Sequence, residues 1–477
     1  MTNCGIAAGG DWVANEFRHM NIRDGRLLKR FMVTAQLLAT HPLDNINKAC
    51  GSWAAAKGAY RLFDNWKLEA EEIFESHQIE TATRVQEHRL VFALQDTTFL
   101  DFDSHLKTEG LGSIAKGYGL KDKLGLILHP TLLVTEKGLP LGLMSLNCWA
   151  RPLRPKMDKN EKRRQYYHKS HDLKESRKWL LAAKETSEKI RGDTRIITIG
   201  DREADMFELF HECLRLKQGF VIRSRINRRT QKNKYRTNKM WEFLDKLPSA
   251  GTTTIEIPGQ RGRPARRADV EIKFKQITTP LRENLRYGPH SKAHGMPNEI
   301  SFFAIKLIEV NPPSETEKLD WILVTSEPIA TLEEAIEKIE WYKLRWQIEI
   351  FFRILKSGCK VESTRLASAE RLQKYIALMA IIAWRIFFLD QIARTTPTLP
   401  CTKVLTDAEW KALYCRIHQT SQVPEQQPNA HEVVRWIARL GGFLNRKGDG
   451  DPGPLVLWRG WQVLQEMMPL WFILQPP

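Results

Sequence analysis

Residues 89–98 read RLVFALQDTT, a continuous apolar run that is followed by Asp96. The same pattern returns at residues 195–201, RIITIGD, where Asp201 follows the run. Short apolar runs of this kind are typical of strands buried on both faces of a sheet, and ligand sites form where such strands end. Either aspartate alone could be a turn or capping residue, so the two positions indicate a site only together with other residues.

The segments around these two runs alternate between strand-like and helix-like patterns. Apolar runs and helical spacings predict a strand hairpin, two helices and a further strand, at residues 124–146, 172–190, 206–216 and 220–224. Residues 226–325 then break the alternation with β-rich pieces that turn-rich, basic segments separate. The pattern predicts an α/β catalytic core, residues 71–370, that carries a β-rich insertion at 226–325.

Helical patterns flank this core on both sides. Residues 26–40 and 52–63 predict helices of an N-terminal domain, residues 1–70, and Arg26, Arg30 and Arg61 are among its basic side chains. We predict that these arginines contact DNA, although a solvated helix face would show the same pattern. The chain is mostly helical again over residues 371–477, which we interpret as a helical C-terminal domain.

The charge balance indicates a polyanionic partner. Lys and Arg number 73 against 56 Asp and Glu, a formal net charge of +17, which suits nucleic acid or an anionic membrane surface. The longest purely apolar run, residues 375–384, is shorter than the roughly 20 residues that span a bilayer. The scattered cysteines form no CxxC pair, which disfavours a disulfide framework or a zinc site. We therefore expect a cytoplasmic protein that binds nucleic acid and no membrane.

A third acid lies inside a long predicted helix. The capping pair T-x-x-E at Thr331 and a glycine at residue 358 predict one helix over residues 331–358. At about 100° per residue, four of its side chains share a stripe about 60° wide: Tyr342, Arg345, Glu349 and Lys356.

Arg353 lies about 20° from the edge of this stripe. A carboxylate among several cations and a phenol suits a phosphodiester site, because the carboxylate can bind a metal ion while the cations bind phosphate oxygens. A surface helix with i,i+4 salt bridges such as Arg345–Glu349 remains the alternative.

These residues carry a family resemblance. Tyr342, Arg345, Glu349 and Lys356 reproduce the signature Tyr-x2-Arg-x3-Glu-x6-Lys, and the chain resembles the DDE transposases of bacterial insertion sequences that have it. LQDTT (94–98) and GDREAD (200–205) look like the family's first and second aspartate motifs. Further segments agree in type and order: AYRLF (59–63), PARR (264–267), ARLGGF (438–443) and LWRGW (457–461). The resemblance implies a ribonuclease H-like core with a β insertion.

The resemblance also implies a chemistry. Asp96, Asp201 and Glu349 are expected to bind two Mg²⁺ ions, for which Mn²⁺ can substitute, about 3.5–4 Å apart. Members of the family nick the transposon end, form and reopen a hairpin, and join the blunt end's 3′-hydroxyl to target DNA. All of these steps are phosphoryl transfers, so one metal pair can serve each of them.

Several DNA contacts follow from the same resemblance. Trp321 matches the tryptophan on which the family stacks a flipped thymine, although a core strand residue would also fit its position. Tyr342, Arg345 and Lys356 would bind the phosphate beside that base, and Arg223 matches a family position near the active site. The basic clusters of the insertion, with Arg263 and Arg266, are expected to contact phosphates too.

The expected partners are double-stranded transposon ends, target DNA and a second copy of the chain. The family acts as a homodimer on paired DNA ends, and a bacterial cytoplasmic protein would join the nucleoid when bound. Two rival functions remain open. One is a ribonuclease H-like nuclease or resolvase that does not transpose, and the other is a catalytically silent DNA-binding inhibitor.

Overall fold

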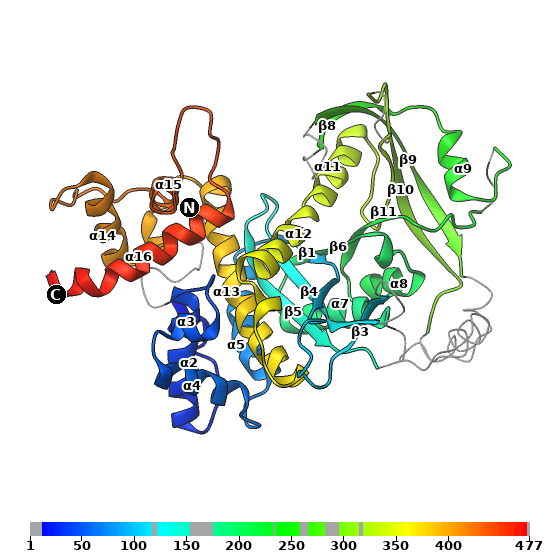
Figure 1. The fold of residues 1–477 in the computed structure, drawn as a ribbon. Coiled ribbons are helices and arrows are strands. Elements are labelled where there is room, and N and C mark those ends of the chain that lie inside the picture. The colour runs from blue at the N-terminus through cyan, green and yellow to red at the C-terminus, as the bar shows by residue number, and fades with distance from the viewer. Residues whose placement is uncertain are drawn as a thin grey trace.

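The computed structural model describes residues 12–116, 122–152, 175–231, 233, 235–257, 266–281, 295–313 and 318–474. Its strands are β1 (Leu90–Gln95), β2 (Thr98–Asp101), β3 (Gly112–Lys116), β4 (Asp122–Val134), β5 (Pro140–Trp149), β6 (Arg195–Gly200), β7 (Gly219–Arg223), β8 (Gly251–Ile257), β9 (Arg266–Pro280), β10 (Glu299–Glu309) and β11 (Asp320–Thr325). Within the described residues they form one sheet, in the order β2-β4-β1-β6-β7-β11-β10-β9-β8, with β3 and β5 also paired to β4 (Figure 1).

The helices fall before, between and after these strands. They are α1 (Trp12–Glu16), α2 (Gly25–Thr40), α3 (Ile46–Cys50), α4 (Trp53–Phe63), α5 (Ala70–Val85), α7 (Arg177–Lys189), α8 (Phe207–Arg215), α9 (Met240–Asp245), α11 (Leu332–Lys343), α12 (Trp346–Arg353), α13 (Ala369–Thr395), α14 (Asp407–His418), α15 (Ala430–Leu440) and α16 (Pro454–Leu474). Short turns η2 (Arg202–Ala204), η3 (Ile354–Gly358), η4 (Val361–Ser363) and η5 (Cys401–Lys403) complete the set.

The central strands have the arrangement that a ribonuclease H-like core requires. Strand β4 pairs antiparallel with both β5 and β1, and β1, β6 and β7 then run parallel. The predicted hairpin is β4–β5, and Gly138 takes a positive φ of 83° in its turn. Buried apolar runs such as residues 90–95 form the inner strands because helices cover both of their faces.

The β-rich insertion extends the core sheet and does not form a sheet of its own. Strand β11 pairs antiparallel with β7, so that Leu323 lies opposite Arg223. Strands β10, β9 and β8 continue outward from β11, each antiparallel to its neighbour. The insertion therefore places Trp321, on β11, next to the last parallel strand of the core.

Alternate residues of β1 serve the two faces of the sheet. Phe92 and Leu94 join the largest apolar core, and the Phe92 ring lies 5.2 Å from that of Trp341 on α11. Val91 and Ala93 face the opposite way, into a separate cluster. Helices α7 and α8 cover that second face farther along the sheet. The helix that carries Glu349 thus crosses one face, above the strands that carry the two aspartates.

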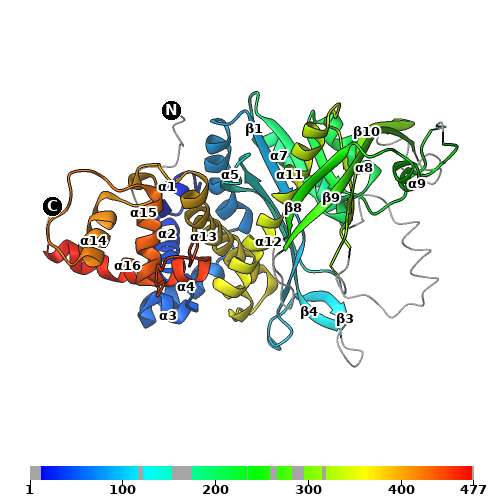
Figure 2. The ribbon, with the colours of Figure 1, turned by 90° about the horizontal axis from the view of Figure 1, so that it is seen from above.

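Helix α13 separates the sheet from the terminal helices. Figures 1 and 2 show α1–α4 and α14–α16 gathered on one side of α13 and the sheet on the other. Among the described residues, α13 is the one helix long and apolar enough to cross a membrane by length and composition, and its apolar window is entirely buried inside the fold.

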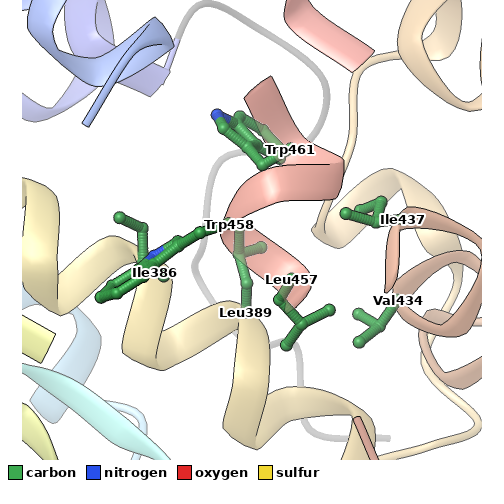
Figure 3. Close-up of a pocket in the computed structure, with 7 residues that line it drawn as sticks. All are labelled: Ile386, Leu389, Val434, Ile437, Leu457, Trp458 and Trp461. Atoms are coloured by element: carbon green, nitrogen blue, oxygen red, sulfur yellow. The ribbon is translucent and has the colours of Figure 1, made fainter. Parts of the chain in front are cut away.

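The N-terminal and C-terminal helices also contact each other. The Gln462 side chain on α16 donates to Asp44, just before α3, over 3.3 Å. Farther along the C-terminal bundle, Trp458 and Trp461 of α16 line a small apolar pocket with residues of α13 and α15, as Figure 3 shows. The two tryptophans are therefore core residues of this bundle in the single chain.

Candidate catalytic site

The two strand-end aspartates lie side by side. In the parallel pair β1–β6, Leu94 is opposite Ile199, and Asp96 and Asp201 each follow two residues later. The Asp96 carboxylate accepts a hydrogen bond from the Thr97 amide over 2.7 Å. Asp201 caps η2 by accepting from the Glu203 amide over 2.8 Å. Both carboxylates are thus fixed by the turn that directly follows each strand.

The helix predicted over residues 331–358 begins after Thr331 and ends at Gly358 as expected, but it is irregular in its middle and in its last turn. The capping box at Thr331 is present, but the hydrogen bonds tighten to i→i−3 between Leu344 and Ile348. The last turn, η3, is a wide π turn that ends at Gly358. A uniform 100° per residue therefore does not hold over the whole helix, although Arg345 still contacts both Tyr342 and Glu349.

The tightened turn brings Arg345 between two of the three acids. One guanidinium nitrogen of Arg345 donates to Asp96 Oδ2 over 3.1 Å, and the other donates to Glu349 Oε1 over 2.5 Å. The i,i+4 pair Arg345–Glu349 therefore exists, but it lies in the site and not on a solvated helix face. Arg345 holds the acids of β1 and α12 together.

The three acids influence one another electrostatically. Burial raises the pKa of Asp96 to about 6; Arg345 opposes this rise, and the charges of Asp201 and Glu349 add to it. Three carboxylates that lie close together and are partly shielded from solvent need nearby positive charge to stay ionised. Arg345 supplies part of that charge.

The three acids provide carboxylate oxygens that can bind a metal ion, but their present arrangement is not that of a metal site. Carboxylate oxygens are the ligands that hard divalent cations such as Mg²⁺ prefer. In the part of the chain that the structure describes, no group of three or more Asp, Glu, His and Cys side chains is arranged to hold a metal ion as it stands. Arg345 engages two of the three carboxylates, so they could become metal ligands once its guanidinium moves aside.

An aromatic and cationic wall adjoins the acids. The rings of Trp321 and Tyr342 meet edge to face, 5.7 Å apart at 76°, and the Arg223 guanidinium lies 5.0 Å from the Trp321 ring centre. Tyr342 is buried, which raises its pKa against the lowering effect of Arg345 and Arg223. Arg223, Trp321, Tyr342 and Arg345 therefore form one series of contacts that reaches Asp96.

The remaining predicted side chains lie farther out. Lys356 donates to the Phe99 carbonyl over 2.8 Å and pairs with Glu362 at 3.3 Å, and Arg353 is exposed. Arg266 makes a two-pronged ion pair with the buried Glu309 across β9 and β10, one contact being 2.9 Å. This partner gives Arg266 a role in the sheet that the sequence did not indicate.

The predicted DNA-contacting residues of the N-terminal region lie on α2 and α4. Arg26 and Arg61 are exposed and Arg30 is half-buried. Arg263 lies outside the described residues. Sequence reasoning missed Trp53, at the start of α4, and Trp66, just after α4, which are 79% and 77% exposed. Tryptophan normally favours burial, so only the fold reveals this exposure.

Sequence reasoning also missed Lys178, which is buried and pairs with Glu203 near the aspartates. Lysine side chains on helices are mostly exposed, so nothing in the sequence indicated that Lys178 is buried.

Comparison with known families identifies the domains. Residues 10–68 match the family described as Transposase DNA-binding, residues 167–385 the Transposase DDE domain, and residues 381–469 the Transposase Tn5 dimerisation domain. Three consecutive parts of the chain are thus similar to the DNA-binding, DDE and dimerisation domains of transposases. The DNA-binding match covers α1 to α4, and the dimerisation match covers α14, α15 and most of α16.

The match to the DDE domain bears on the site. It includes Asp201, Glu349 and the wall formed by Arg223, Trp321 and Tyr342. A DDE transposase domain implies a ribonuclease H-like core and dependence on divalent metal ions, and the strand order agrees with that core.

Proposed function

We propose that this chain cuts an insertion element out of donor DNA through a nick, a hairpin and a blunt end, and joins the 3′-hydroxyl ends to target DNA. The observation that carries the proposal is that Arg345 joins Asp96 to Glu349, with Asp201 next to Asp96 and the Arg223–Trp321–Tyr342 wall adjoining. A plain nuclease needs the acids alone, whereas a hairpin also requires a place for a displaced base.

The three acids would hold two Mg²⁺ ions, with Mn²⁺ as a substitute. When bound, such a pair activates the attacking oxygen and stabilises the leaving oxygen of a phosphodiester. Asp96 and Asp201 come from rigid strand ends and Glu349 from α12. This placement suits the in-line displacement that every step of transposition requires.

Arg345 would exchange its partners when DNA binds. Its two nitrogens donate to Asp96 and Glu349 in the DNA-free chain. A phosphate offers the same two-pronged acceptor geometry as a carboxylate. Transfer of the guanidinium to a DNA phosphate would release both carboxylates for the metal ions, so that substrate binding and metal binding would support each other.

The neighbouring side chains would hold the DNA end. Half-buried Trp321 offers a ring for a flipped base, while the Tyr342 edge and the Arg223 guanidinium fix that ring in place. Base stacking on an aromatic ring contributes about 1–3 kcal/mol, which offsets the cost of unstacking the base. Lys356 would leave the Phe99 carbonyl to bind the adjacent phosphate.

We infer a homodimer on paired DNA ends in the bacterial cytoplasm, associated with the nucleoid. The last turns of α16 support this assembly, because Leu470, Phe472 and Ile473 are more than half exposed there. An exposed apolar helix end of this kind is typical of a surface that a partner covers.

The test uses a plasmid that carries the element's own termini, incubated with Mg²⁺. We expect blunt-end release by the wild type and by the control Glu340→Gln, whose side chain pairs with Lys343 on the surface. Glu349→Gln should reduce cutting by about a thousandfold or more and leave binding to the ends nearly unchanged, because it removes a metal ligand and no DNA contact.

Three outcomes would contradict the proposal. Nicking by the wild type without a hairpin or joined product would indicate the nuclease, and binding without cutting would indicate the inhibitor. Loss of end binding by Glu349→Gln would indicate that Glu349 has only a structural role.

A further inference from the structure

A single hydroxyl connects the two loops that carry the aspartates. Thr97 directly follows Asp96, and its Oγ1 lies 3.0 Å from Nδ1 of His129 on β4 and 3.4 Å from Oε2 of Glu203. Glu203 follows Asp201 by two residues, and its amide donates to the Asp201 carboxylate over 2.8 Å. These contacts therefore link the turn that follows Asp96 to the turn that follows Asp201. They do not use the carboxylate oxygens that remain free for other partners.

The direction of these hydrogen bonds follows from the groups involved. The Glu203 carboxylate only accepts, so the Thr97 hydroxyl donates to it and accepts from the imidazole of His129. Burial of His129, together with the nearby Lys178, lowers its pKa well below the usual value, and the imidazole is neutral. Nδ1 is the ring nitrogen that faces Thr97, and Nε2 lies 3.4 Å from the Gln95 side-chain oxygen.

Two further contacts fix the ends of this chain. The Lys178 ammonium, buried on α7, reaches both Glu203 oxygens, at 3.1 and 3.2 Å. The His129 ring meets the ring of Trp179, also on α7, edge to face at 4.7 Å. Four elements therefore converge behind the aspartates: the end of β1, strand β4, turn η2 and helix α7.

We propose that Thr97, His129, Glu203 and Lys178 act as positioning residues, a hydroxyl clamp that sets the separation of Asp96 and Asp201 for divalent cations. The inference rests on the proposed function and adds to it the residues that prepare the metal site. Two carboxylates on separate loops repel each other, so a bridge between their turns, in which Lys178 balances the charge of Glu203, keeps them at a fixed spacing. None of the four side chains needs to touch metal or DNA for this.

The test separates the hydroxyl from the fold. Thr97→Val keeps the shape of the side chain and removes the hydroxyl, whereas Thr97→Ser keeps the hydroxyl. The matched control is Thr131→Val, because Thr131 is buried on the same strand as His129 and its hydroxyl bonds to Ser145 over 2.7 Å, away from the aspartates. Mn²⁺ binding to the full-length chain, bound to an already cleaved element end, is measured by electron paramagnetic resonance, alongside thermal unfolding without metal.

We expect Thr97→Val to bind Mn²⁺ about 10–100-fold more weakly than the wild type, the usual cost of removing a group that orients a metal ligand. Thr97→Ser and Thr131→Val should bind like the wild type. Cutting by Thr97→Val should recover as the Mn²⁺ concentration rises, which a loss of fold would not permit.

Wild-type Mn²⁺ affinity in Thr97→Val would overturn the clamp, and so would an equal loss of affinity in Thr131→Val. If Thr97→Val does not fold, Glu203→Gln replaces it, since this half-exposed side chain can lose its charge without filling or emptying the core. Unchanged Mn²⁺ binding there would also overturn the clamp. A wild type that binds no Mn²⁺ even with the DNA end present would overturn the proposed function itself.

Discussion

In the metal-free protein, the environment of Asp96 lowers the stability of the folded state. The pKa of Asp96 is raised to about 6. Burial is the largest cause, the charges of Asp201 and Glu349 add to it, and Arg345 opposes it. The folded chain therefore holds a proton on Asp96 at a pH where the unfolded chain has released it. Between about pH 4 and pH 6 the folded state binds more protons, so the free energy of unfolding falls as pH rises through that window.

Asp96→Asn should therefore stabilise the metal-free protein at pH 8. We expect a gain of about 1–3 kcal/mol, and almost none at pH 4, where the wild-type carboxyl is also neutral. Denaturant unfolding in a chelator at the two pH values measures this difference.

Asp101→Asn is the control for this substitution, because Asp101 accepts hydrogen bonds from the Asp103 amide and Lys123 and its loss should not stabilise. An Asp96→Asn variant that is less stable than the wild type at pH 8 would contradict the electrostatic account.

At the scale of the element, the helix that carries Glu349 depends on a contact at its far end. The wide turn η3 ends at Gly358, and a β-carbon there would lie 1.6 Å from the ring of Trp458 on α16. Trp458 is buried in the C-terminal bundle. The glycine thus allows the C-terminal bundle to pack directly against the turn that follows Glu349 and contains Lys356.

Gly358→Ala should push the Trp458 ring from its place. We expect a loss of about 1–3 kcal/mol of stability, the usual cost of overpacking, measured by denaturant unfolding. Gly358→Ala combined with Trp458→Leu should recover part of it.

Gly58→Ala serves as the control for Gly358→Ala, because this helical glycine has open space around it and alanine favours a helix. Equal stability of Gly358→Ala and the wild type would show that the ring shifts at no cost.

At the scale of the whole molecule, a buried ion cluster joins the N-terminal helices to the core. Glu16 on α1 accepts from Arg84 at 2.9 and 3.0 Å and lies 2.5 Å from His77, both on α5. Arg84 also donates to the Leu141 carbonyl on β5 and lies 4.4 Å from the Trp384 ring centre on α13. One carboxylate therefore links α1 to the sheet and to α13.

Glu16 should make the stability of the folded chain sensitive to acid. Although burial raises its pKa, Arg84 and His77 outweigh burial and bring the pKa down to about 2. A depressed carboxyl pKa stabilises above the unfolded value near 4.5, and this contribution is lost as pH falls from about 5 toward 2. Glu16→Gln should cost about 3 kcal/mol at pH 7, and the difference from the wild type should shrink below pH 4.

Unfolding curves at pH 3 and pH 7 test the prediction for Glu16. Glu75→Gln on α5 is the control, because its exposed pair with Lys189 should contribute under about 1 kcal/mol. A Glu16→Gln difference that stays constant with pH would contradict the assigned role.

Local patterns were sufficient to predict the elements and the acids. Apolar runs of strand length predicted the parallel strands, and an aspartate after each run marked two members of the site. The helix start at Thr331 was equally readable, because a capping box is made by neighbours in the chain. The tightened turn at Arg345 was not, since its reach toward Asp96 depends on a strand 249 residues away.

The sequence by itself determined which strands, helices and acids exist, because apolar periodicity, capping and charge act over a few residues. Only the tertiary structure decided that Trp321 meets Tyr342, that Lys178 is buried, and that Thr97 lies between His129 and Glu203. Such contacts depend on how distant segments pack, and burial gives a lysine or a hydroxyl a partner that no local pattern announces.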